Sequence, residues 1–288
     1  MSELSNLVAE ELALAVDPRV SDFAAAIAER HGKASRAVLF YGSCLRQAEL
    51  NGLMLDFYLI VSDYRAAYDK RWLAAANALI PPNVFYIEHG GLVAKYAVLS
   101  EADFHRLCGP TTRNVSVWAR FAQPSRLVWS ADQAARATVI DSIAWSAPTL
   151  LAAAVPRARE PHLDLWRRAF ALTYSAELRA ERKARAGSVV DVDPERYRRF
   201  GEPALQAARA LRGTVSTGWR SRRIGGKLLS VARLAKASLT FSGGADYIVW
   251  KINRHAGTNF ELKPWQRRYP LLGALSLLPR LLKSGAVR

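Results

Sequence analysis

Apolar residues in the first third of the chain follow two different periods. At 4–16 and 20–32 they recur every three or four positions, which predicts two amphipathic helices. Short runs rich in β-branched and aromatic residues predict four strands, at 37–42, 54–62, 83–88 and 92–99. This order of elements predicts the α+β class, with a mixed sheet and helices over about 100 to 130 residues.

Turn and breaker residues separate these elements. Residues 65–80 predict a helix with Trp72 and Leu79 facing the core. Pro81-Pro82 ends it, because proline cannot continue the helical hydrogen bonds. Gly90-Gly91 predicts the turn between the last two strands.

The pattern changes after the predicted sheet. From about 132 to 211 the spacing is helical, except that 188–193 predicts a loop or a short extended piece. We therefore predict a sheet domain at 1–130 and a helical domain at 131–211 that closes over its site. The remaining residues, 212–288, form a third region that differs from both in charge.

Charge is distributed unevenly along the 288 residues, whose net charge is +16. Residues 1–110 have a net charge of −3, whereas residues 212–288 hold 15 Lys and Arg against two acids, a net charge of +13. A basic segment of this kind indicates an anionic partner, either nucleic acid or an anionic lipid surface.

Apolar runs in the basic region favour the lipid surface. Residues 227–241 place Leu228, Val231 and further apolar residues on one helix face, away from Arg233 and Lys236. Residues 269–282 are nearly all apolar but too short to span a bilayer, so we expect them to lie in the membrane interface.

Trp250 and Trp265 would lie at headgroup level in that arrangement. The alternative is a helix packed on the core with its charges in solvent. The sequence leaves both readings open.

The candidate chemistry begins where the first predicted strand meets Gly42-Ser43. Glycine allows a tight turn and a close approach of backbone to a phosphate, and Ser43 can begin a helix whose N–H groups face that phosphate. Thirteen residues after Ser43, Asp56 lies inside the second apolar strand. A carboxylate there can hold Mg²⁺ beside a nucleoside triphosphate, because Mg²⁺ takes one or two protein carboxylates together with substrate oxygens.

The cysteines and the N-terminus bear on the compartment. Cys44 and Cys108 provide no disulfide framework, which favours a reducing compartment, and we expect Cys44 to be a small apolar filler. The acidic N-terminus argues against a transit peptide, and no signal-peptide pattern is seen. We therefore expect a cytoplasmic protein, peripheral on the inner face of the cell membrane.

Several short motifs together resemble one family. They are Tyr41-Gly42-Ser43, Met54-Leu55-Asp56-Phe57, Lys95-Tyr96-Ala97-Val98, the segment Tyr174 to Arg179, and Lys236 to Thr240. In this order they resemble the mitochondrial-type phosphatidate cytidylyltransferases, the translocator assembly and maintenance proteins, within the nucleotidyltransferase superfamily. The motifs are scattered over about residues 20 to 255.

The resemblance implies a nucleotidyltransferase domain at 1–130 that uses Mg²⁺ to join CTP and phosphatidate into CDP-diacylglycerol, with release of pyrophosphate. The resemblance argues against nucleic acid as a partner. The resemblance implies catalytic roles for Asp56, Lys95, Glu177 and Arg179. It also implies that Tyr41, Gly42 and Ser43 contact phosphate and that Asp56 and Asp63 bind the metal.

The motifs also depart from the superfamily pattern. Polymerase-β-type enzymes usually carry a second acid two residues after the first, where this chain has Tyr58, and Asp63 is the nearest substitute. Cys44 replaces a glycine, and Ala176-Glu177 replaces Gly-Asp. A rival interpretation is therefore an RNA-binding nucleotidyltransferase or a catalytically inactive relative, although the sequence contains no RNA-recognition motif.

Overall fold

The computed structural model describes residues 2–47, 49–157, 160–177, 189–211, 213–240, 261 and 263–268. Its strands are β1 (Ser35–Tyr41), β2 (Met54–Val61), β3 (Asn83–His89), β4 (Leu92–Ser100) and β5 (Ser125–Ser130). The helices of the first half are α1 (Glu3–Leu12), α2 (Pro18–Glu29), η1 (Gly32–Ala34), η2 (Ser43–Arg46), α3 (Tyr64–Ala67), α4 (Arg71–Leu79), α5 (Glu101–Cys108) and α6 (Trp118–Phe121). Those of the second half are α7 (Gln133–Ala144), α8 (Ser146–Ala154), α9 (His162–Ala176), α11 (Pro194–Ala210), α12 (Trp219–Thr240) and α14 (Pro264–Arg268).

The five strands form one mixed sheet in the order β3-β4-β2-β1-β5. Neighbouring strands are antiparallel except β2 and β4, which run parallel. The α+β class predicted from the sequence is confirmed. In the register of the sheet, Asp56 of β2 pairs with Tyr41 of β1 on one side and with Lys95 of β4 on the other.

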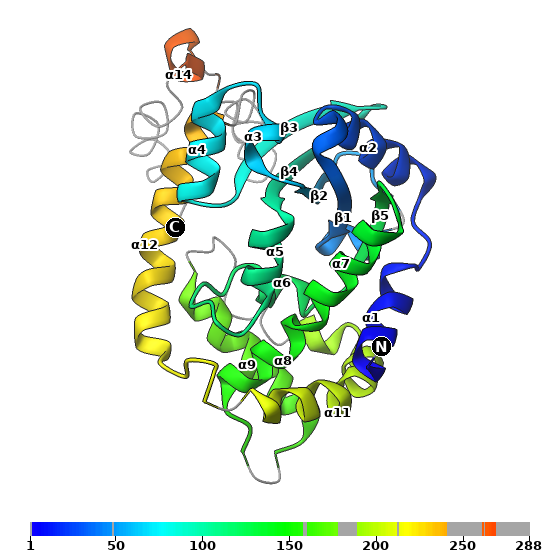
Figure 1. Ribbon diagram of the computed structural model, residues 1–288, viewed down its shortest axis with the longest axis vertical. Coiled ribbons are helices and arrows are strands. Elements are labelled where there is room, and N and C mark those ends of the chain that lie inside the picture. Colours follow the sequence, from blue (N-terminus) through cyan, green and yellow to red (C-terminus); the bar gives the residue numbers. More distant parts are fainter. Residues whose placement is uncertain are drawn as a thin grey trace.

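Successive side chains of a strand point to opposite faces of the sheet, so the strands contribute to two cores. Leu39, Tyr58 and Ile60 belong to the larger core, beneath α1, α5–α9 and α11, whereas Phe57 and Leu59 belong to the smaller one, beneath α2, α3 and α4 (Figure 1). By the same alternation, the side chains of Asp56 and Lys95 point to the side of the sheet that holds the larger core. Both therefore face the larger helical layer.

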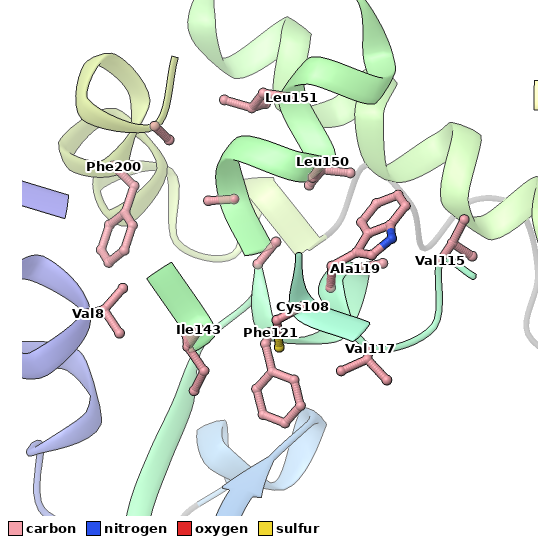
Figure 2. Close-up of a cluster of buried hydrophobic side chains, with 14 of the residues drawn as sticks. Val8, Cys108, Val115, Val117, Ala119, Phe121, Ile143, Leu150, Leu151 and Phe200 are labelled. Atoms are coloured by element: carbon pink, nitrogen blue, oxygen red, sulfur yellow. The ribbon is translucent and has the colours of Figure 1, made fainter. Parts of the chain in front are cut away.

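The larger core crosses the predicted domain boundary at residue 130. Figure 2 shows part of it, where side chains from several helices converge: Val8 of α1, Phe121 of α6, Ile143 of α7, Leu150 of α8 and Phe200 of α11. Residues of 1–130 and of 131–211 thus share one hydrophobic core. The helical segment is a layer on the sheet rather than a unit with a core of its own.

Residues Gln133–Ala154, which form α7 and α8, are the one stretch of the described chain long and apolar enough to cross a membrane. In the structure 72% of that apolar window is buried inside the protein. Its apolar character is therefore accounted for by packing in the larger core.

The helix predicted at 65–80 forms as two, α3 and α4, and its predicted core contacts are wrong. Trp72 and Leu79 are 47% and 81% exposed, whereas Ala74 and Asn77 are buried. Asn77 occupies the inward position because its amide donates to the carbonyl of Val98 at 3.0 Å and its oxygen accepts from the backbone of Asn83. A polar residue satisfied in this way is invisible to an apolar periodicity.

Helix α12 contacts α9 at one end and β3 at the other, and it lies along the side of the molecule (Figure 1). In a helix with solvated charges, the apolar side chains would pack on the protein and the basic ones would face solvent. Between Leu228 and Lys236 the arrangement is reversed. Leu228 and Val231 are 67% and 56% exposed, whereas Lys236 is buried and Arg233 is half-buried against the protein. Residues 269–282 and Trp250, predicted to contact the membrane, lie outside the described residues, and Trp265 is exposed on α14.

Candidate functional site

The turn after β1 forms as the sequence predicts. Gly42 has φ 94° and ψ −165°, a conformation that non-glycine residues rarely adopt, and Ser43 begins the single 3₁₀ turn η2. A Cβ atom on Gly42 would lie 3.2 Å from the Oδ2 atom of Asp56. The turn backbone therefore lies directly against the carboxylate, and Ser43 is exposed beside it.

Asp56 and Lys95 meet across the parallel pair β2 and β4. The Nζ atom of Lys95 lies 3.1 Å from the Oδ1 atom of Asp56, and the two side chains are 44% and 21% exposed. The contact is an ion pair without a well-directed hydrogen bond, since Oδ1 is buried and has no hydrogen-bond partner among the described residues. Asp56 and Lys95, both named as candidate site residues from the sequence, are thus neighbours in the sheet.

Tyr58 occupies the position of the second acid, on the same face of β2 as Asp56. Its side chain is buried, and its hydroxyl accepts a hydrogen bond from Nη1 of Arg120 at 3.0 Å. The guanidinium of Arg120 also lies over the ring of Tyr41, 5.1 Å from its centroid. Tyr41 is itself buried, so its contribution is to support Arg120 from within the core.

Arg120 contacts both tyrosines, and its surroundings favour the charged form of its guanidinium. Burial alone would lower the pKa of Arg120, but Tyr41, Tyr58, Glu177 and Asp56 together raise it above its ordinary value. Glu177, at the C-terminal end of α9, is among the charges that act on Arg120. The sequence-predicted pair Asp56 and Glu177 is therefore brought into one electrostatic environment.

Arg233 of α12 is a second arginine near this cluster. Its Nε donates to the carbonyl of Pro81 at 2.8 Å and its Nη1 to the hydroxyl of Ser116 at 2.8 Å. Burial lowers the pKa of Arg233, while Tyr58 and Glu177 act to raise it and Arg120 to lower it. Two arginines thus face one tyrosine and one glutamate.

Lys236 lies one turn beyond Arg233, and its ammonium bonds backbone carbonyls of the described residues. Its Nζ donates to the carbonyls of Ile80 and Pro82, the second at 2.8 Å. Burial, with a smaller contribution from Arg233, lowers the pKa of Lys236 to about 8. The motif residue therefore anchors α12 to the turn before β3.

Asp63 does not join the site, which corrects the metal ligand expected from the sequence. Its carboxylate accepts hydrogen bonds from the backbone of Arg65 and Ala66 and so caps α3. Seven residues separate it from Asp56 along β2, about 23 Å at the usual rise of ~3.3 Å per residue. A single ion cannot reach both carboxylates.

Two further predicted residues complete the account. Cys44 is buried in the smaller core and donates to the carbonyl of Met54 at 3.4 Å. Burial, followed by the charge of Asp56, raises the pKa of the Cys44 thiol, so the expected role of apolar filler fits and a nucleophilic thiolate does not. Arg179 lies outside the described residues.

With Asp63 set aside, Asp56 is the candidate ligand that remains, and its carboxylate is suited to one Mg²⁺ ion. Oδ1 of Asp56 is a buried acceptor whose one described partner is the ammonium of Lys95, and Mg²⁺ is commonly held by one carboxylate, water and substrate phosphates. No cluster of three or more His, Cys, Asp or Glu side chains suited to a metal occurs in the described part of the chain. Further ligands would therefore come from substrate and solvent.

No protein-family model matches the chain, and no curated protein matches it. Sequence reasoning missed Arg120, Arg233 and Ser116 as members of this site. A signal was present for the first, because Arg120 is the single charge within the apolar run Val115 to Ala122.

Proposed function

We propose that this protein transfers a cytidylyl group from CTP to phosphatidate. A phosphate oxygen of phosphatidate attacks the α-phosphorus of CTP, and a new P–O bond forms. The bond from the α-phosphorus to the oxygen that bridges to the β-phosphate breaks, and its electron pair leaves with pyrophosphate. The products are CDP-diacylglycerol and pyrophosphate, and no oxidant, reductant or further reactant is required.

One observation carries the proposal: the backbone of Gly42 lies against the carboxylate of Asp56, which is ion-paired with Lys95. A carboxylate in contact with a glycine turn and a lysine suits a triphosphate and its counter-ion. This geometry supports the proposed reaction class. Cytidine as the base and phosphatidate as the acceptor follow from the family resemblance.

Each residue has a distinct task in the proposed reaction. Asp56 would hold Mg²⁺, which supplies positive charge at the phosphates when bound. The N–H groups after Gly42 and the ammonium of Lys95 orient the triphosphate. Because the attacking phosphate is an anion at neutral pH, positioning and charge neutralisation matter more than a general base, and a site with Tyr58 in place of the second acid remains competent.

A lipid substrate requires access to a membrane surface, and α12 offers a suitable face. Ile224, Leu228 and Val231 are 56%, 67% and 56% exposed, and their spacing places them on one side of the helix. The cations Arg220, Arg223 and Lys227 are exposed beside them. We include in the proposal that this face, together with the basic region that follows it, rests on an anionic cytoplasmic membrane surface.

Pyrophosphate release is the direct test. The purified protein is incubated with Mg²⁺, each of the four ribonucleoside triphosphates, and phosphatidate in mixed micelles. Release with CTP and phosphatidate alone, together with CDP-diacylglycerol as the product, is expected. Release with another nucleotide would correct the base, and silence with all four from folded protein would remove the proposed activity.

A second candidate is a catalytically inactive relative that binds RNA. The observation in its favour is that Tyr58 is buried and hydrogen-bonded to Arg120, so the position of the second acid is occupied by a structural pair. Binding to anionic vesicles and to RNA, each measured across a salt series, separates the two. Preference for RNA with a steep salt dependence would favour this candidate.

A further inference from the structure

Arg120 and Arg233 come from distant parts of the chain and meet on one residue, Ser116. Nη1 of Arg120 donates to the backbone carbonyl of Ser116 at 3.4 Å, and Nη1 of Arg233 donates to its hydroxyl at 2.8 Å. Two guanidinium groups joined in this way repel each other, as the lowering of the pKa of Arg233 by Arg120 reflects. Holding like charges together is unfavourable unless an anion lies between them or beside them.

The acids nearby leave part of this charge unmatched. Asp56 is ion-paired with Lys95, and among the described residues Glu177 is the acid that acts on both arginines. Nη2 of Arg233 is buried and has no hydrogen-bond partner among the described residues. A buried guanidinium N–H without a partner is costly, and a phosphate oxygen that reached it would supply the missing acceptor.

We infer that Arg120 and Arg233 form the subsite for the phosphate monoester of the acceptor. This inference rests on the proposed function, because it assigns one reactant to one part of the same site. A phosphate monoester carries between one and two negative charges near neutral pH and presents three oxygens. Two arginines match that charge, and arginine is the side chain best shaped for phosphate oxygens.

The bond of Arg120 to Tyr58, rather than to the Gly42 turn, favours the acceptor over the triphosphate as its ligand. Gly42 and Lys95 act at Asp56, whereas Arg120 is bonded to Tyr58, two residues further along the same face and about 7 Å away at the usual strand rise. In-line displacement needs the attacking and leaving groups on opposite sides of the reacting phosphorus. An anion subsite at Arg120, separate from the Gly42 turn, suits that requirement.

The loop that carries Ser116 is fixed by its own hydrogen bonds. The Ser116 hydroxyl donates to Oδ1 of Asn114 at 2.8 Å, and its backbone N–H donates to the same oxygen at 3.0 Å. Buried Arg222 of α12 donates to the carbonyls of Thr112 and Arg113 at 3.2 and 2.8 Å. Ser116 is therefore a positioning residue that presents Arg233 in a set orientation.

Titration calorimetry with dihexanoyl phosphatidate, a soluble phosphate monoester, tests the subsite without turnover. Arg233→Gln is expected to weaken its binding by at least about tenfold, because a charge-assisted hydrogen bond is lost, and Arg233→Lys to weaken it less. Ser116→Ala, which leaves the charge in place but removes its anchor, is expected to fall between the wild type and Arg233→Gln. Arg198→Gln is the control, since Arg198 is exposed on α11 and pairs with Glu195.

Three further arms make the result decisive. Dihexanoyl phosphatidylglycerol, a diester, is expected to bind more weakly than the monoester, and CTP is expected to bind Arg233→Gln as it binds the wild type. In turnover, the KM for phosphatidate rises in this variant while the KM for CTP stays within about twofold. Unchanged monoester affinity in folded Arg233→Gln, or a loss confined to CTP, overturns the inference. Wild-type protein that binds the monoester without releasing pyrophosphate would instead overturn the proposed function and leave the subsite standing.

Discussion

Gly42 and Asp56 touch across the β1–β2 pair: a Cβ atom on Gly42 would lie 3.2 Å from the Oδ2 atom of Asp56. The contact links the turn that would receive the phosphates to the carboxylate that would hold their counter-ion. Because Gly42 also has φ 94°, both its backbone conformation and its missing side chain are needed at this position.

Gly42→Ala is therefore expected to damage the site beyond its effect on stability. The positive φ alone costs roughly 1–2 kcal/mol in an L-residue, and the added methyl group also presses on Asp56. Gly91→Ala is the matched control, because Gly91 has φ 76° and nothing within 4 Å of its Cβ position. Both variants should lose stability in chemical denaturation, Gly42→Ala more than Gly91→Ala, and only Gly42→Ala should lose turnover. Equal turnover in the two would show that the contact with Asp56 is unimportant.

Replacing either of two adjacent glycines of α12 by alanine is expected to change the free energy of unfolding, in opposite directions for the two positions. A Cβ atom on Gly226 would collide with the carbonyl oxygen of Ala176 on α9, whereas Gly225 has nothing within 4 Å. Gly226→Ala should lower the free energy of unfolding by about 1–3 kcal/mol through overpacking. Gly225→Ala should raise it by about 0.5–1 kcal/mol through helix propensity. Denaturant titrations measure both, and a stabilised Gly226→Ala would contradict the close packing of α12 on α9.

Lys236 is expected to make stability rise with pH above about 8. Burial lowers its pKa in the folded protein to about 8 from an ordinary value of 10.5, so between these values the unfolded chain binds the proton that the folded protein has released. The free energy of unfolding then increases with pH. Below pH 8 both states are protonated and this contribution is constant.

The comparison of wild type with Lys236→Met isolates that effect. Burial raises the pKa of Tyr64 and Tyr68, which favours unfolding as the pH rises past the ordinary tyrosine value of 10.0, so the series is kept between pH 7.5 and about 9.5. The slope of unfolding free energy against pH should be steeper in the wild type than in the variant. Equal slopes would show that Lys236 is not desolvated.

The outer face of α12 is expected to contribute to membrane binding. Leu228→Asp should weaken sedimentation with vesicles containing phosphatidylglycerol by about tenfold or more, since burying a leucine is worth roughly 1.5–3 kcal/mol. Leu79→Asp is the control. It makes the same change of side chain at a position that is 81% exposed but lies on α4. Equal loss in both variants, or no loss in either, would contradict a membrane role for this face.

Strand and helix positions near the site followed from local pattern. The run ending at Gly42 and the run containing Asp56 have the alternation and the turn residue that a sheet requires, and β1, η2 and β2 form where these signals lie. Lys95 was placed beside the site by resemblance, and the parallel pairing of β2 with β4 brings it to Asp56. Strand β5 and helices α5 and α6 were not predicted, because their short segments carry little periodicity.

Tertiary packing decided what the sequence could not. Asp63 resembled a substitute ligand by its position in the chain, but the straight course of β2 carries it to the far end of the strand, where it caps α3. Arg233 and Lys236 were read as charges away from an apolar face, yet the α12 face that packs on the protein is the one that carries them. Carbonyl groups of the turn before β3 accept these donors, and no one-dimensional pattern shows where such acceptors will lie.

The most direct test of the account is turnover in Asp56→Asn compared with the wild type, with CTP, Mg²⁺ and phosphatidate in mixed micelles. The substitution keeps the shape of the side chain and removes the charge that pairs with Lys95. The account predicts that the wild type forms CDP-diacylglycerol and that the variant, with an unchanged circular dichroism spectrum, loses activity by about a hundredfold or more. If folded Asp56→Asn turned over substrate as fast as the wild type, the central role of this carboxylate would be contradicted.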